Sequence, residues 1–207
     1  MLTLVVGGAS SGKSAVAESI CMDIPGRKAY IAAMMPFGEQ AQQRIKRHIK
    51  LRESKGMDTI ECYTDISTIA PVAEEYDVLL IEDMTNLVAN EMFSTVAASS
   101  ADSGTVPDYG SNTVLSGEPN AITSSVLNEN ISEKIFNETS QLGCICPNLV
   151  IVTCDVFCGG ASYENETLEY MQHLGRLNQM LAGRADRVIE VWYGLVTDMK
   201  GGVNEAY

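Results

Sequence analysis

Residues 7–14 read Gly7-Gly8-Ala9-Ser10-Ser11-Gly12-Lys13-Ser14, and they follow directly on the apolar run Leu2–Val6. This octapeptide fits the pattern GxxxxGK[ST], in which glycines let the backbone wrap closely around a phosphate. Its N–H groups would point at the anion, and the N-terminus of the next helix would add positive potential. Lys13 is expected to reach the β- and γ-phosphates, and Ser14 to ligate Mg²⁺. The sequence therefore predicts a nucleoside triphosphate site, for ATP or GTP.

Strand-like apolar runs alternate with helical patterns along most of the chain, which is typical of a parallel sheet covered by helices. The predicted strands are residues 2–6, 28–33, 59–63, 78–81, 149–153 and 187–191, with a short terminal strand within 192–200. The predicted helices are residues 13–22, 39–54, 66–75, 84–93, 122–142 and 166–182. We predict one α/β domain of the P-loop NTPase class, RecA-like, with a mostly parallel sheet flanked by helices.

Residues 94–121 differ in composition from the rest of the chain. Ser, Ala, Gly, Asn, Thr and Asp dominate, two prolines occur, and Lys and Arg are absent. Such a segment buries too little apolar surface to offset the entropy of ordering it. We interpret it as a mobile insertion within the single domain 1–207, not as a linker between two domains.

The charge of the chain is unevenly distributed. The formal net charge is −13, which argues against a nucleic-acid partner. Six of the 14 basic residues nevertheless lie in one stretch of twelve, namely Arg44, Lys46, Arg47, Lys50, Arg52 and Lys55. This concentration is consistent with a small anionic ligand, although a solvated helix face would have the same composition.

The sequence favours a cytoplasmic protein. It contains neither an apolar run long enough to span a bilayer nor a basic leader at its start. Its six cysteines are Cys21, Cys62, Cys144, Cys146, Cys154 and Cys158. We expect reduced, mostly buried thiols, because the spacing of the last four does not match a usual zinc knuckle. Metal binding by those four cysteines is the alternative.

Acidic residues follow two of the predicted strands. Glu82 and Asp83 come directly after the buried run 78–81, where the carboxylate that holds or orients Mg²⁺ usually lies. Asp155 follows the run 149–153 in the same way. The alternative for each is an ordinary solvent-exposed carboxylate. We expect Glu82 to belong to the nucleotide and Mg²⁺ site.

His48 lies within the basic stretch, with Arg44 and Arg52 one helical turn to either side. Residues at this spacing share one helix face. The two cations would lower the pKa of the imidazole and favour the neutral form that attacks phosphorus, and they could bind the displaced phosphates. His48 is therefore a candidate nucleophile, with a plain surface histidine as the alternative.

Taken together, the motifs resemble the bifunctional adenosylcobinamide kinase/adenosylcobinamide-phosphate guanylyltransferase family of cobalamin biosynthesis. The resemblance covers residues 1–93 and about 148–196. Beyond the phosphate loop, its markers are Tyr30-Ile31-Ala32, Arg44-Ile45-Lys46-Arg47-His48 with Arg52, Glu82 through Asn90, and Gly175-Arg176-Leu177-Asn178-Gln179 with Leu181-Ala182 and Ala185-Asp186. The loop is common to many families, whereas the segments RIxxH and GRxNQxLAxxAD in this order are far more specific.

The resemblance implies two successive transfers. A nucleoside triphosphate phosphorylates the terminal hydroxyl of the adenosylcobinamide side chain, and GMP from GTP then passes onto that phosphate through a guanylylated histidine. On this resemblance His48 carries GMP as a phosphoramidate, while Lys13, Ser14 and Glu82 hold the triphosphate and Mg²⁺. The resemblance also implies a corrinoid substrate and a homo-oligomer.

The chain departs from the family pattern at four places. Gln40 replaces an acid before the RIxxH segment, and Cys154-Asp155 replaces Asn-Glu. Residues 160–163 replace Gly-Ile-Val-Pro, and Met171-Gln172 replaces an Arg-Asp pair. Because most of these changes lie in the second half, two alternatives stay open. One is a kinase or single-activity transferase for another small substrate, and the other is a non-catalytic nucleotide-binding regulatory module.

Overall fold

The computed structural model describes residues 1–35, 55–100, 130–157 and 163–202, and the helix residues 94–100 without their side chains. The strands are β1 (Leu2–Gly7), β2 (Lys28–Ala32), β3 (Met57–Glu61), β4 (Val78–Glu82), β5 (Asn148–Cys154), β6 (Arg187–Trp192) and β7 (Leu195–Lys200). The helices are α1 (Lys13–Asp23), the 3₁₀ helix η1 (Ile66–Ile69), α3 (Ala70–Ala73), α4 (Met84–Ser100), α5 (Ile131–Ile145) and α6 (Asn165–Arg184).

The strands form one seven-stranded sheet in the order β3-β2-β4-β5-β1-β6-β7. Every pairing is parallel except that of β6 with β7, which is antiparallel and places β7 at an edge. The carboxyl ends of β1, β4 and β5 therefore lie along one border of the sheet. Ligands of open α/β sheets bind at this border. The predicted α/β architecture, a mostly parallel sheet flanked by helices, is confirmed.

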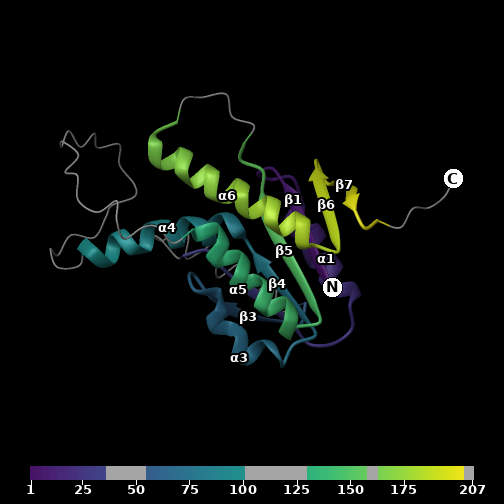
Figure 1. Ribbon diagram of the computed structural model, residues 1–207. Helices are drawn as coiled ribbons and strands as arrows, with labels where there is room; N and C mark the ends of the chain where they lie inside the picture. Colours follow the sequence, from purple (N-terminus) through teal and green to yellow (C-terminus); the bar gives the residue numbers. More distant parts are fainter. Residues whose placement is uncertain (36–54, 101–129, 158–162, 203–207) are drawn as a thin grey trace.

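Helices cover both faces of the sheet (Figure 1). Alternate residues of the central strands point to opposite sides, so β4 sends Val78 and Leu80 into one core and Leu79 and Ile81 into the other. Helix α1 packs into the first of these cores. Helices α4, α5 and α6 pack into the second, larger core. This two-sided burial explains why residues 78–81 of β4 are all apolar.

Two of the predicted helix boundaries are wrong. Helix α4 continues to Ser100, beyond the predicted end near Phe93, so the first residues of the segment 94–121 are helical. Alanine, a strong helix former, recurs in this stretch and allows the helix to continue. Helix α5 begins at Ile131, later than residue 122, because Asn130 is extended at its N-cap. Asparagine favours such cap positions over helix interiors.

The remaining elements follow the predictions more closely. Strand β3 begins and ends two residues earlier than predicted, and the helix predicted for 66–75 is divided between η1 and α3. The basic helix predicted for 39–54 lies outside the described residues, as does most of the segment 94–121. In the part of the chain that is described, no helix has the length and apolar character needed to cross a bilayer.

The cysteines in the described ranges are free thiols. Cys21, Cys62 and Cys146 are buried, as predicted for most of them, whereas Cys144 is exposed and Cys154 half-buried. Burial raises the pKa of Cys21 to about 12, so this thiol stays protonated inside the core that α1 covers. Cys158, which belongs to the alternative metal group, lies outside the described residues.

Candidate functional site

The predicted phosphate loop connects β1 to α1 and is packed tightly where it leaves the sheet. A Cβ atom on Gly7 would lie 2.5 Å from Ser11 Oγ and 2.6 Å from the Val191 carbonyl oxygen, so only glycine fits here. Ser10 and Gly12 have positive φ angles of 58° and 95°. These left-handed residues turn the backbone back on itself, a geometry that gathers N–H groups around an anion.

Lys13 is the first residue of α1, and its side chain is directed back over the loop. The residue is only 8% exposed, and its Nζ donates a hydrogen bond to the Gly8 carbonyl oxygen at 3.3 Å. The buried hydroxyl oxygen of Ser11 has no hydrogen-bond partner within the described residues. A buried polar atom without a partner is uncommon, and an anion in the loop would give this hydroxyl an acceptor.

Ser14 and Glu82 meet across the carboxyl border of the sheet. The Ser14 hydroxyl, one residue into α1, donates a hydrogen bond to Glu82 Oε1 at the end of β4. Burial raises the pKa of Glu82, and the nearby charge of Asp83 adds to this effect, while the hydrogen bond from Ser14 acts against it. Two hard oxygen atoms thus lie side by side next to the loop. This donor set suits Mg²⁺, which prefers oxygen ligands.

The adjacent carboxylate of Asp83 has a different partner set. Its Oδ1 accepts hydrogen bonds from the Thr85 hydroxyl and from the Asn86 backbone and side-chain nitrogens, the latter two at 2.9 and 2.8 Å. Asp83 therefore holds the first turn of α4, as N-cap residues do. The two neighbouring acids divide their roles, because Glu82 meets the phosphate loop and Asp83 the helix.

Two connections hold the border of the sheet around Glu82. The Ala33 N–H donates to the Glu82 carbonyl oxygen at 3.1 Å, which ties the end of β2 to the end of β4. Asn90 on α4 donates from Nδ2 to the carbonyl oxygens of Ala33 and Tyr63, both at 2.8 Å. Asn90 belongs to the segment that suggested the family resemblance, and its role here is to position backbone beside the site.

The turn between β6 and β7 also contacts the phosphate loop. The Gly194 N–H donates to the Ser11 carbonyl oxygen at 2.8 Å. Tyr193 and Gly194 both have positive φ angles, 50° and 78°, which is the pattern of a tight two-residue hairpin. Our sequence reasoning missed this contact. The dipeptide Tyr193-Gly194 could have predicted the hairpin. Nothing in the sequence indicates that this hairpin contacts the phosphate loop.

Three of the predicted site residues, Arg44, His48 and Arg52, lie outside the described residues. The described chain resumes at Lys55, the last member of the basic stretch. The Lys55 ammonium pairs with the carboxylate of Glu18, which lies on α1 just beyond the phosphate loop. Lys55 is thus joined to the helix that carries Lys13 and Ser14.

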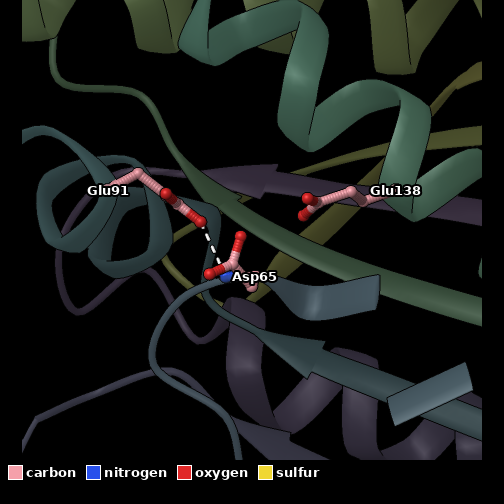
Figure 2. A group of neighbouring side chains, drawn as sticks. All are labelled: Asp65, Glu91 and Glu138. Atoms are coloured by element: carbon pink, nitrogen blue, oxygen red, sulfur yellow. Dashed lines mark hydrogen bonds between the residues drawn. The ribbon is translucent and has the colours of Figure 1, made fainter. Parts of the chain in front are cut away.

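A separate acidic cluster lies among η1, α4 and α5 (Figure 2). Carboxylate oxygens of Asp65, Glu91 and Glu138 come within 4.8 Å of one another. The Lys134 ammonium occupies the cluster, 2.5 Å from Asp65 Oδ1 and 2.8 Å from Glu91 Oε2, with Glu138 Oε1 at 4.0 Å. The Asp65 N–H also donates to Glu91 Oε1 at 2.7 Å. This cluster is therefore an ion-pair network and not the predicted Mg²⁺ site.

The profile of the family described as "Cobinamide kinase / cobinamide phosphate guanyltransferase" matches residues 3–199. The chain belongs to this family. The predicted enzyme class, a kinase and guanylyltransferase of cobalamin biosynthesis, is the class of the family. The family resemblance drawn from the sequence motifs is thereby confirmed.

Curated relatives of this cobinamide kinase/guanyltransferase family member match along their whole length. The bifunctional adenosylcobalamin biosynthesis protein CobU of Salmonella typhimurium is 29% identical over 203 residues, which cover 97% of this chain and 100% of the relative. The protein of the same name from Escherichia coli is 25% identical over 201 residues, with the same coverage. Among solved structures, a KaiC-like protein from Pyrococcus horikoshii is 11% identical, with a TM-score of 0.47. The match covers 91% of this chain and 71% of the KaiC-like chain.

The late motif that suggested the family lines a cavity of about 960 Å³ between α6 and the sheet. Gly175, Arg176, Asn178 and Gln179 of the motif face it, together with apolar side chains from β1 and from the segment after β5. The departures Met171, Gln172 and Asp155 line the same cavity. Three of the departures from the family pattern therefore lie together, whereas Gln40 and residues 160–162 are outside the described residues.

A backbone hydrogen bond connects the wall of the cavity to the phosphate loop. The Asp155 N–H donates to the Gly7 carbonyl oxygen at 3.2 Å, so the wall of the cavity and the start of the loop are joined. The buried Thr153 hydroxyl donates to Asn178 Oδ1 at 2.8 Å and fixes α6 against β5. A large, mainly apolar hollow with a few polar groups is the usual form of a site for an organic substrate.

Proposed function

We propose that this protein phosphorylates adenosylcobinamide with a nucleoside triphosphate and then transfers GMP from GTP onto the new phosphate, giving adenosylcobinamide-GDP. Membership of the family supports the pair of activities. The structural observation that carries the proposal is the convergence of Lys13, Ser14 and Glu82 at the loop between β1 and α1. These residues are the parts that phosphoryl transfer needs, because it depends on positioning and charge neutralisation.

In this proposal the residues of the loop, Gly7 to Ser14, bind the triphosphate through backbone N–H groups. Lys13 exchanges its contact with the Gly8 carbonyl oxygen for the β- and γ-phosphates. The Ser14 hydroxyl and the Glu82 carboxylate hold Mg²⁺, which neutralises phosphate charge when bound. The raised pKa of Glu82 favours this role, because a buried carboxylate gains from pairing with a cation.

The guanylyl step is proposed to use His48 as the nucleophile. A neutral imidazole nitrogen attacks the α-phosphorus of GTP, the bond from that phosphorus to the bridging oxygen breaks, and pyrophosphate leaves. An oxygen of adenosylcobinamide phosphate then attacks the same phosphorus and releases the histidine. Arg44 and Arg52 would bind the phosphates. The ion pair between Lys55 and Glu18 supports this assignment, because it joins the last residue of the basic stretch to α1.

We assign the acceptor to the cavity lined by the α6 motif. Its volume of about 960 Å³ suits a large organic substrate, and its wall at Asp155 is bonded to the first residue of the phosphate loop. Arg176 and Gln179 supply polar groups within the mainly apolar lining. This arrangement brings an acceptor next to a triphosphate, as a kinase requires.

We also propose that the protein works as a cytoplasmic homo-oligomer. The free thiols of the described residues suit a reducing compartment. Strand β7 is an edge strand that exposes Val196 and Met199, with 49% and 62% of their surfaces accessible. An exposed apolar edge is a surface on which a second copy can pack. The molecular mass in solution, measured by light scattering, tests this assignment.

The function is tested by incubating the protein with adenosylcobinamide, Mg²⁺ and GTP and identifying the corrinoid products by mass spectrometry. We expect adenosylcobinamide phosphate first and adenosylcobinamide-GDP second. Phosphate transfer without the GDP product would indicate a single-activity kinase. Nucleotide binding with no corrinoid product would contradict the proposal, and turnover with another acceptor would favour the alternative substrate that the changes at Met171 and Asp155 allow.

A further inference from the structure

The β6–β7 turn and the phosphate loop form one packed unit. Besides the hydrogen bond from Gly194 to Ser11, a Cβ on Gly12 would lie 3.4 Å from Gly194 Cα. At the other end of the loop, the space beside Gly7 is closed by the Val191 carbonyl oxygen at the end of β6. Residues between Val191 and Gly194 are therefore held beside the loop by backbone contacts. Trp192 and Tyr193 lie between these two contacts in the chain.

The two residues in this position are aromatic and exposed. Tyr193 is 90% accessible to solvent and Trp192 46%. Their ring centroids lie 6.2 Å apart, with the planes tilted by 55°, and Trp192 Nε1 donates to Glu190 Oε1 at 2.7 Å. Core packing does not account for a tyrosine this exposed, because aromatic side chains stabilise proteins mainly through buried contact area.

A nucleotide held by its phosphates extends its ribose and base beyond the loop. The base is a flat π system, and an aromatic side chain at the rim offers it a stacking surface. We propose that Tyr193 stacks against the base of the nucleoside triphosphate whose phosphates occupy residues 7–14, with Trp192 beside it. This inference rests on the proposed function, since it assumes that the loop binds a triphosphate.

Stacking also has a consequence for nucleotide choice. Every base has a π face, so a stacking residue adds affinity with little selection between adenine and guanine. Tyr193 therefore serves GTP and ATP alike. Selection of guanine in the second transfer is left to groups that form hydrogen bonds with the base edge.

The test compares ligands with and without a base. Dissociation constants for GTP, ATP and inorganic tripolyphosphate are measured by calorimetry for the wild type, Tyr193→Ala, Tyr193→Phe and Leu195→Ala. Leu195 is the matched control, because it lies in the same hairpin and is 73% exposed. Tyr193→Ala should weaken GTP and ATP binding by about fivefold or more, since base stacking contributes measurably to affinity. Tyr193→Phe and Leu195→Ala should bind as the wild type does.

Tripolyphosphate affinity should be the same in these four proteins, because this ligand lacks the base. Equal loss of tripolyphosphate and GTP binding in Tyr193→Ala would overturn the inference, since the loop itself would then be disturbed. Unchanged GTP binding in Tyr193→Ala would overturn it as well. Lys13→Ala distinguishes a failure of the stacking role from a failure of triphosphate binding. If Lys13→Ala weakens all three ligands while Tyr193→Ala weakens none, the triphosphate site stands and only the stacking role is wrong. If the wild type binds none of them, the proposed function fails too.

Discussion

The Ser14 hydroxyl donates a hydrogen bond to Glu82 Oε1, which joins the start of α1 to the end of β4 across 68 positions of sequence. The contact brings the hydroxyl group of the phosphate loop next to the carboxylate at the end of a buried strand. Because both oxygen atoms suit Mg²⁺, their separate removal should affect metal-dependent activity in the same way.

We therefore expect Ser14→Ala and Glu82→Gln each to lower Mg²⁺-dependent phosphoryl transfer by about 10- to 100-fold, the range seen when groups that hold or orient a metal are removed. The two variants should fold as the wild type does. Initial rates over a Mg²⁺ titration provide the measurement. Full activity of either variant at ordinary Mg²⁺ concentrations would contradict the role given to this pair.

Glu82 also predicts how stability depends on pH. Its pKa is raised in the folded protein, chiefly by burial, so the charged form is disfavoured there. The stability that the carboxyl group contributes is present below its ordinary pKa of 4.5 and is lost as the pH rises through the folded pKa. Glu82→Gln should consequently unfold at a higher temperature than the wild type at neutral pH, with a difference that shrinks toward pH 4.5. Thermal unfolding across this pH range is the check, and an equal gap at every pH would be inconsistent with it.

Two neighbouring glycines make a matched pair of tests for the loop. The Cβ of Gly7→Ala would meet Ser11 Oγ and the Val191 carbonyl oxygen, both under 3 Å, whereas that of Gly8→Ala would meet nothing within 4 Å. We expect Gly7→Ala to lower the free energy of unfolding by about 1–3 kcal/mol, as overpacking does. Gly8→Ala should leave it unchanged or slightly raised. Urea denaturation measures both, and equal stabilities would show that the loop is looser than described.

Several residues of the candidate site could be predicted from local sequence patterns. The loop, Lys13 and Ser14 follow from one motif, and Glu82 follows from its place after a buried apolar run. The hydrogen bond between Gly194 and Ser11 could not be predicted, because it depends on β6 pairing with β1 and no local pattern records that neighbour. The cavity at Gly175 is likewise a product of how α6 lies on the sheet. The sequence identifies several of its lining residues as a family motif, but it does not indicate that they line a cavity.

Lys134 should be essential to the stability of the acidic cluster. Hydrogen bonds with Asp65 and Glu91 raise the pKa of Lys134 against the opposing effect of burial. Lys134→Met would leave Glu91, which is 8% exposed, charged and without its cation. We expect a loss of about 3 kcal/mol in the free energy of unfolding, as when one partner of a buried ion pair is removed.

The double variant Lys134→Met/Glu91→Gln should recover part of the lost free energy of unfolding, because it also removes the unpaired charge of Glu91. Chemical denaturation of the single and double variants measures both effects. A single variant as stable as the wild type would mean that the network contributes little.

The cavity is tested by filling it. A Cβ on Gly175 would lie 3.3 Å from Phe157 Cζ, whereas one on Gly183 in the same helix would have nothing within 4 Å. Gly175→Leu should lower acceptor phosphorylation by about tenfold or more, because a small displacement of bound substrate costs this much. Gly183→Leu is the control and should behave as the wild type. Nucleotide affinity should be equal in both, and a loss of nucleotide affinity in Gly175→Leu would contradict an acceptor site here.

In the proposed guanylyl transfer, GMP passes through the protein itself, on His48. The most direct measurement incubates the protein with α-labelled GTP and Mg²⁺ and tests for a labelled adduct that is labile to acid and stable to base. The wild type should become labelled, and His48→Ala should not, while Lys13→Ala should label weakly because triphosphate binding is impaired. An unlabelled wild type, or a His48→Ala variant labelled as strongly as the wild type, would contradict the account.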